Sequence, residues 1–171
     1  MAIRRVRAWL FALGVSASLL TGCASNPGST LRVLPPRQPT AEAATDSAVV
    51  RTALRYLGTP YVLGGTTPSG FDCSGFVWYV YRQGGVDLPR NVTKQATAGR
   101  PVTREEVRAG DLVFFITTGP GITHVGMATS RDAFVHAPNS RGVVRVEALT
   151  SPYWSQRYAG ARRVAVPDRL P

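Results

Sequence analysis

The period of apolar and polar positions changes near residue 110. Before it, two runs at residues 46–57 and 73–83 carry apolar residues at helical spacing. Asp46 is suited to cap the first run, Gly58 follows its end, and Gly84 stops the second. The pattern therefore predicts two N-terminal helices, with the folded domain beginning at Asp46.

After residue 110, short β-branched or aromatic runs alternate with turn residues, which is typical of strands. The predicted strands are residues 111–116, 123–129, 133–137, 143–148 and 161–166. Shorter segments predict a helix at 91–98, one helical turn at 103–106, and a loop or short helix at 151–158. Helices followed by an antiparallel meander indicate an α+β fold, with the N-terminal helices packed on a five- to six-stranded antiparallel sheet.

The N-terminus has the pattern of an export signal. A basic segment with Arg4 and Arg5 precedes an apolar run at residues 8–20, too short to span a bilayer. The following Leu20-Thr21-Gly22-Cys23 resembles the bacterial lipobox, in which the Cys is acylated and becomes the mature N-terminus. We therefore expect residues 1–22 to be a signal peptide and Cys23 to carry lipid; the alternative is an ordinary signal with an incidental Cys.

Residues 23–45 have no apolar period and contain several prolines, so they predict a flexible tether. Residues 46–171 then form one domain, because 171 residues with 44% hydrophobic content suit a single core plus accessories. Ala24 after the acylated Cys favours, by resemblance to Gram-negative lipoproteins, sorting to the outer membrane. The expected location is therefore lipid-anchored at the outer membrane, facing the periplasm.

The net charge is +10, from 20 Lys and Arg against 10 Asp and Glu. Such a surface favours anionic surroundings such as lipid head groups or wall polymers. Nucleic acid fits the charge equally well, but the export signal argues against it as a partner.

The chain has two cysteines, and if Cys23 carries lipid then Cys73 has no disulfide partner within it. Cys73 stands at the start of the second predicted helix, where unpaired N–H groups and the helix dipole favour a thiolate. We therefore expect a partly ionised nucleophile; the alternative is a small apolar core residue.

The two histidines, His124 and His136, fall in neighbouring predicted strands. A hairpin turning symmetrically about Ser130 would place them directly opposite each other on one face, with Cβ atoms about 5 Å apart. Each is otherwise an ordinary strand residue with its hydrogen bonds satisfied. Nucleophilic catalysis by cysteine needs a base and a group that orients the base, so one thiol and two imidazoles supply the three parts.

Six segments together resemble, in order and spacing, the NlpC-type family of bacterial cell-wall cysteine peptidases. They are Gly58-Thr59-Pro60-Tyr61-Val62-Leu63-Gly64-Gly65, Phe71-Asp72-Cys73-Ser74-Gly75-Phe76, Leu88-Pro89-Arg90, Gly110-Asp111-Leu112-Val113-Phe114-Phe115, Thr123-His124-Val125-Gly126-Met127 and Phe134-Val135-His136-Ala137. The resemblance covers residues 47–166 and implies a compact papain-like fold.

The resemblance also implies roles for individual residues. Cys73 is expected to be the nucleophile and His124 the general base, with His136 orienting that base. Tyr61, together with the Cys73 backbone N–H, is expected to stabilise the oxyanion. Asp72 and Ser74 match positions that line the substrate groove, although Asp72 is equally consistent with a carboxylate that only caps the helix.

The implied reaction is hydrolysis of an amide bond in a peptidoglycan stem peptide, at γ-D-glutamyl or meso-diaminopimelate residues, without a cofactor and by a monomer. A bond within one stem and a cross-link between two stems both remain open. Two other classes of protein also remain open: a metal site made by the Cys and the two His, and a wall-binding lipoprotein without activity.

Overall fold

The computed structural model describes residues 41–138 and 142–167. The predicted signal peptide, the lipid site at Cys23 and most of the predicted tether lie outside the described residues. Within the described ranges, none of the helices combines the length and apolar character needed to cross a bilayer.

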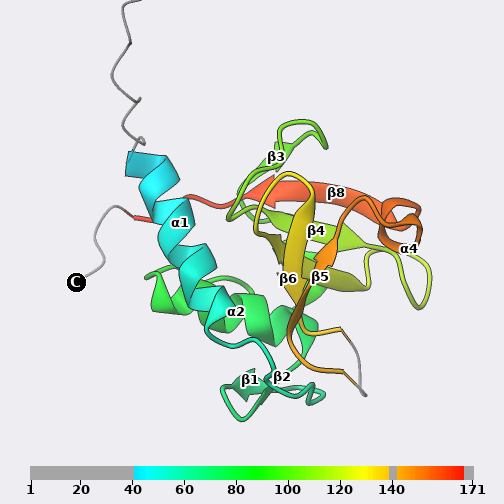
Figure 1. Ribbon diagram of the computed structural model, residues 1–171, viewed down its shortest axis with the longest axis horizontal. Coiled ribbons are helices and arrows are strands. Elements are labelled where there is room, and N and C mark those ends of the chain that lie inside the picture. The colour runs from blue at the N-terminus through cyan, green and yellow to red at the C-terminus, as the bar shows by residue number, and fades with distance from the viewer. Residues whose placement is uncertain (1–40, 139–141, 168–171) are drawn as a thin grey trace, which may run out of the picture. The chain divides into compact units, whose positions relative to one another are not determined.

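Two helices pack against each other on one side of the molecule (Figure 1). The first, α1 (Ala41–Leu54), starts earlier than the predicted Asp46. Three alanines at 41, 43 and 44 explain the difference, because Ala has the highest helix propensity. The second helix, α2 (Cys73–Gln83), has the predicted bounds and is capped by Asp72.

Six antiparallel strands form one sheet in the order β3-β8-β4-β5-β6-β7 (Figure 1). They are β3 (Arg100–Val102), β4 (Leu112–Phe115), β5 (His124–Ala128), β6 (Ala133–His136), β7 (Arg145–Ala148) and β8 (Tyr158–Arg163). The α+β prediction with five to six strands is confirmed. The meander prediction holds for β4 to β7, whereas β8 returns to pair with β4 on its other side.

The remaining elements are short. They are the two-stranded ladder of β1 (Thr66–Thr67) and β2 (Gly70–Phe71), with α3 (Val92–Gln95) and α4 (Pro152–Ser155). The single helical turn predicted at residues 103–106 is a hydrogen-bonded turn, closed by a bond from the Glu106 N–H to the Thr103 carbonyl at 3.2 Å. Strand β3 was not predicted, because its Arg-Pro-Val sequence has no alternating apolar pattern.

The sheet has an apolar layer on each face. Side chains such as Phe114, Val125 and Met127 belong to the core cluster that includes the buried face of α2. Side chains on the opposite face of the sheet, such as Phe115 and Phe134, pack in a second cluster with Trp154 of α4. The even-numbered positions of β5 and β6 therefore point away from α2 and toward α4.

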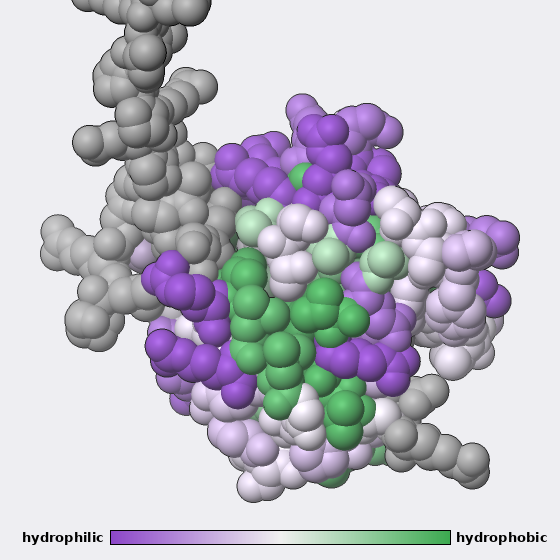
Figure 2. All heavy atoms as spheres, viewed as in Figure 1, coloured by the Kyte–Doolittle hydropathy of each residue, from purple (hydrophilic) through white to green (hydrophobic). Residues whose placement is uncertain are grey.

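Part of the α1 side is also apolar at the surface. Figure 2 shows apolar side chains gathered over the middle of this face, with hydrophilic ones around them. At the end of α1, Leu54 is 37% exposed, and Leu57 just beyond it is 48% exposed.

Gly75, in the first turn of α2, provides a stability test. A Cβ there would lie 2.0 Å from the Gly65 carbonyl oxygen and 3.0 Å from an Asp72 carboxylate oxygen. Since the first of these is backbone, Gly75→Ala should lower the free energy of unfolding in urea by about 2–3 kcal/mol. Gly119→Ala is the matched control, because its Cβ would meet no atom within 4 Å. Equal stability of the two variants would contradict this close packing.

Candidate active site

The start of α2 is held by the Asp72 carboxylate. Its Oδ1 accepts a hydrogen bond from the Gly75 N–H at 2.7 Å, which is an N-cap, and its Oδ2 accepts one from the Gly64 N–H at 2.9 Å. Its backbone also takes part, because the Asp72 N–H donates to the Gly65 carbonyl at 3.2 Å. The loop before β1 is thus fastened to the first turn of the helix.

Arg90 completes this arrangement from the segment that follows α2. One guanidinium nitrogen lies 2.6 Å from Asp72 Oδ2, and the other donates to Ser74 Oγ at 2.7 Å. Burial opposes ionisation of Asp72, but the hydrogen bonds from Arg90, Gly75 and Gly64 hold the pKa of the carboxyl below its usual value. Asp72 is therefore a structural cap at least, and Arg90 is a site residue to which we assigned no role from the sequence.

Cys73 is the free cysteine among the described residues, and its side chain is partly buried against the α2 core. Burial raises the pKa of the thiol, and the Asp72 carboxylate raises it further. Backbone hydrogen bonds from Val125, Ser74 and Cys73 itself favour the thiolate but do not outweigh those effects. The expectation of a partly ionised thiol is therefore wrong: the helix start is present, but desolvation and a neighbouring negative charge dominate.

The two imidazoles are in contact. His124 Nε2 lies 2.8 Å from His136 Nδ1, and both side chains are buried. Direct opposition in the hairpin is wrong, however, because Met127 pairs with Val135 and Ala128 with Phe134. This register is two residues from the predicted one, so His136 lies diagonally from His124 on the same face.

Gly126 makes this diagonal contact possible. A Cβ at Gly126 would lie 3.1 Å from the His136 Cβ and 2.6 Å from the Phe134 ring. Because this position in the middle of β5 has no side chain, the His136 ring can extend across it toward His124.

Trp154 of α4 covers both imidazoles. Its ring stacks on His124, with centroids 5.5 Å apart and planes at 24°, and meets His136 edge-on at 5.0 Å. Burial lowers the pKa of His124 to about 4. Burial also lowers the pKa of His136 to about 2, helped by the charges of His124 and Arg145. Both rings are therefore neutral at neutral pH.

Cys73, at the start of α2, lies beside the first residues of β5. The Val125 backbone bonds to the Cys73 thiol, and His124 is the preceding residue of the strand. In the described part of the chain the thiol makes no hydrogen bond with either ring; such pairs are often loose before substrate binds. Across residues 41–138 and 142–167, no three His, Cys, Asp or Glu side chains are grouped to hold a metal ion.

Tyr61 lies near the same thiol. Burial raises the pKa of its phenol, a thiolate at Cys73 would raise it further, and the Asp72 carboxylate also raises it, so the hydroxyl stays protonated and able to donate. An isolated bridge to Phe71 and a bond from the Tyr61 N–H to the Gly142 carbonyl, at 2.9 Å, fix its backbone.

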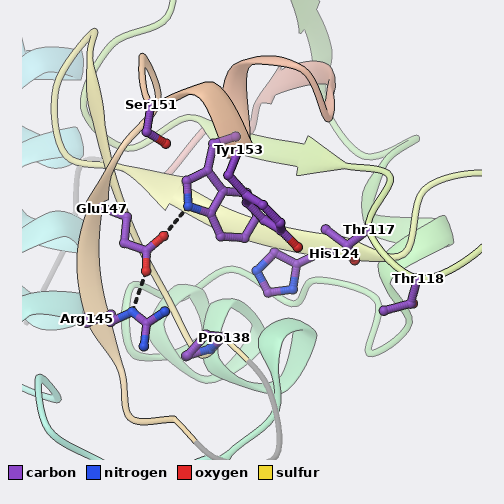
Figure 3. A pocket seen from close by; sticks show the side chains of 9 residues that line it. Thr117, Thr118, His124, Pro138, Arg145, Glu147, Ser151 and Tyr153 are labelled. Atoms are coloured by element: carbon purple, nitrogen blue, oxygen red, sulfur yellow. Dashed lines mark hydrogen bonds and ion pairs between the residues drawn. The ribbon is translucent and has the colours of Figure 1, made fainter.

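A cavity of about 450 Å³ opens beside His124 on the side of α4 (Figure 3). Its wall carries hydroxyls, a guanidinium, a carboxylate and three aromatic rings. It is formed by Thr117, Thr118, His124, Pro138, Arg145, Glu147, Ser151, Tyr153 and Trp154. Sequence reasoning missed Glu147, Arg145 and Trp154. The sequence indicates only that the strand carrying Arg145 and Glu147 follows the strand of His136, and this order assigns no role to either residue.

The structure thus holds a thiol at a helix start and a buried pair of hydrogen-bonded imidazoles, one of them on the residue before Val125. These are the groups that nucleophilic catalysis by cysteine requires. The model of the NlpC/P60 family matches residues 58–163, so this chain belongs to that family. The resemblance inferred from the sequence motifs is therefore confirmed.

Named relatives of the chain are endopeptidases and a hydrolase, and one of them is named for murein. It is 37% identical to "Probable endopeptidase NlpC" of Escherichia coli K12, over 88% of this chain and 96% of that protein. It is 45% identical to "Murein DD-endopeptidase MepS/Murein LD-carboxypeptidase" of the same strain, over 63% of this chain. The chain spans only 56% of the MepS protein and 30% of a Bacillus subtilis γ-DL-glutamyl hydrolase.

Solved structures agree on the fold. The NlpC/p60 domain of the peptidoglycan hydrolase SagA is similar with a TM-score of 0.63 and 37% identity, covering 70% of this chain and 98% of that domain.

The buried imidazoles predict acid sensitivity of the fold. The unfolded chain binds protons at its histidines near pH 6.5, whereas the folded pKa values are about 4 and about 2. Protons thus bind the unfolded chain first, and stability present above pH 6.5 is lost as the pH falls toward 4. Urea unfolding at pH 7 and pH 5 should differ by on the order of 2–4 kcal/mol.

Protonation of Asp72 does not contribute to the difference in unfolding free energy between pH 7 and pH 5. The pKa of its carboxyl is lowered, so its contribution is lost only at pH values below the ordinary value of 3.8. Unfolding free energies that agree at pH 7 and pH 5 would contradict the neutral, buried imidazole pair.

Proposed function

We propose that this protein is a peptidoglycan endopeptidase that hydrolyses an amide bond in murein stem peptides or their cross-links through a thioester on Cys73. The observation that carries the proposal is the 2.8 Å contact between His124 Nε2 and His136 Nδ1. His124 begins β5, and the next residue of that strand, Val125, bonds to the thiol through its backbone. Membership of the NlpC/P60 family and the endopeptidase names of its relatives support it.

In the proposed reaction the resting groups are neutral. As Cys73 Sγ attacks the carbonyl carbon, His124 takes the thiol proton through the ring nitrogen that does not face His136. The resulting imidazolium then gives this proton to the leaving amine, and the C–N bond breaks. Water, deprotonated by His124, hydrolyses the thioester and restores the thiol.

The tetrahedral intermediate carries a negative oxygen that needs donors. The Tyr61 hydroxyl is protonated and lies near the thiol, and this supports the assignment of Tyr61 as one donor. The other donor is the Cys73 backbone N–H. Asp72 and Ser74 are proposed to border the substrate groove. Since Arg90 holds both of them, it belongs to the same wall.

The cavity beside His124 is proposed to take the part of the substrate that carries the leaving amine, because His124 must reach that amine to protonate it. Its guanidinium, carboxylate and hydroxyl groups suit a residue with free amino and carboxyl groups, such as diaminopimelate (Figure 3). Both γ-D-glutamyl–diaminopimelate bonds within a stem and cross-links between stems satisfy this requirement.

Digestion of purified sacculi tests the proposal. Cys73→Ala removes the nucleophile and should lower release of soluble muropeptides at least about 1,000-fold, with the fold retained because Ala fits the partly buried site. Mass spectrometry of the wild-type products names the bond. Equal digestion by wild type and variant would refute cysteine catalysis; no digestion by either would favour a wall-binding protein without activity.

We further propose that the protein is exported and held at the outer membrane by lipid on Cys23, facing the periplasm as a monomer. The sequence before Cys23 supports this assignment. Two acyl chains at one residue give stable membrane anchoring.

Expression of the full precursor in a Gram-negative host tests the anchor. The mature protein should begin with a diacylated Cys23 by mass spectrometry and fractionate with the outer membrane, whereas Cys23→Ala should be recovered in the soluble fraction. An unmodified Cys23 peptide in the wild-type protein would contradict the assignment.

A further inference from the structure

Glu147 of β7 lies on the same sheet face as the histidines. In the β6–β7 pair, His136 is opposite Arg145 and Phe134 is opposite Glu147. Since alternate residues of a strand share a face, Glu147 is the diagonal neighbour of His136. His136 therefore has a histidine on one side and a carboxylate on the other.

The contacts agree with this register. Glu147 Oε2 lies 3.8 Å from His136 Nε2, and the same carboxylate accepts hydrogen bonds from the Trp154 indole N–H and the Arg145 guanidinium (Figure 3). The His136 ring is fully buried, and among the described residues its Nε2 makes no hydrogen bond. The Glu147 side chain, 23% exposed, faces that nitrogen.

The direction of the bond between the two imidazoles decides whether His124 can act as a base. A neutral imidazole carries one proton. If His136 carries it on Nε2, toward Glu147, its Nδ1 can only accept, so His124 must donate from Nε2. The other nitrogen of His124, Nδ1, is then unprotonated and free to take the proton of Cys73.

The reverse direction blocks the reaction. If His136 donates from Nδ1, His124 Nε2 accepts and the His124 proton stays on Nδ1, where no lone pair remains for the thiol proton. Two imidazoles alone have no strong preference between the directions. A carboxylate beside His136 Nε2 favours the first direction, because a carboxylate accepts a hydrogen bond but cannot donate one when ionised.

We propose that Glu147 is a positioning residue that fixes the proton on His136 Nε2 and thereby sets His124 as the base, an inference that rests on the function proposed above. Glu147 takes no part in the proton transfer, because the thiol proton moves only to His124 and then to the leaving amine. By binding the Trp154 indole, Glu147 also holds the ring that covers both imidazoles.

The test compares Glu147→Gln with Glu105→Gln in the full-length protein. Glutamine is isosteric with glutamate, but its amide can donate to His136 Nε2 and so permits the reverse direction. With a soluble muropeptide substrate, Glu147→Gln should lower kcat about 10- to 100-fold and change KM less than about twofold. Glu105 is exposed, so Glu105→Gln makes the same charge change away from the site and should match wild type.

Imidazole ¹⁵N spectra give a readout that does not depend on activity, and the wild-type spectrum tests the proposal whether or not the variant folds. Wild type should show His124 protonated on Nε2 and His136 protonated on Nε2, and Glu147→Gln should show part or all of His124 protonated on Nδ1. Protonation of His124 on Nδ1 in wild type, or unchanged tautomers and kcat in Glu147→Gln, would overturn the proposal. Wild type with the expected tautomers but no hydrolysis would instead refute only the proposed function.

Discussion

The carboxylate of Asp72 is the constraint on which the rest of the site depends. It joins three segments, the loop around Gly64, the first turn of α2 and the segment that carries Arg90. A buried carboxylate without these donors would be strongly unfavourable, so the three segments must come together for the helix to start where it does. The position of the thiol is thus set by the neighbouring residue that caps the helix. The same negative charge raises the pKa of Cys73, which makes a nearby base more important.

The sequence predicts the parts of this site better than their arrangement. The bounds of α2 follow from an apolar stripe between Asp72 and Gly84, and the strands of both histidines follow from short β-branched and aromatic runs. Their common sheet face requires a turn that is centred on one residue, because a turn centred between two residues would place them on opposite faces. The register does not follow either, because it depends on the turn between β5 and β6, which is centred on Arg131 and not on Ser130.

Contacts between distant segments are also absent from local patterns. Glu147 belongs to a short and partly exposed strand, and Trp154 to a helix of one turn. Neither segment has a periodicity that assigns its residues to a site. They meet because β7 pairs with β6 and because the second apolar layer of the sheet draws α4 over the face that carries the histidines. Only the tertiary fold creates that neighbourhood, so only the structure reveals it.

The protonated state of Cys73 also affects how long such a protein lasts. Peroxides and disulfides react with thiolates, and a thiol whose pKa is raised by burial presents little thiolate at neutral pH. In an oxidising compartment, a lone cysteine with a depressed pKa would be steadily lost to sulfenic acid or mixed disulfides. In the proposed reaction the nucleophilic form arises only when the neutral His124 takes the proton during attack. On that proposal, resistance to oxidation and catalytic competence coexist in one side chain.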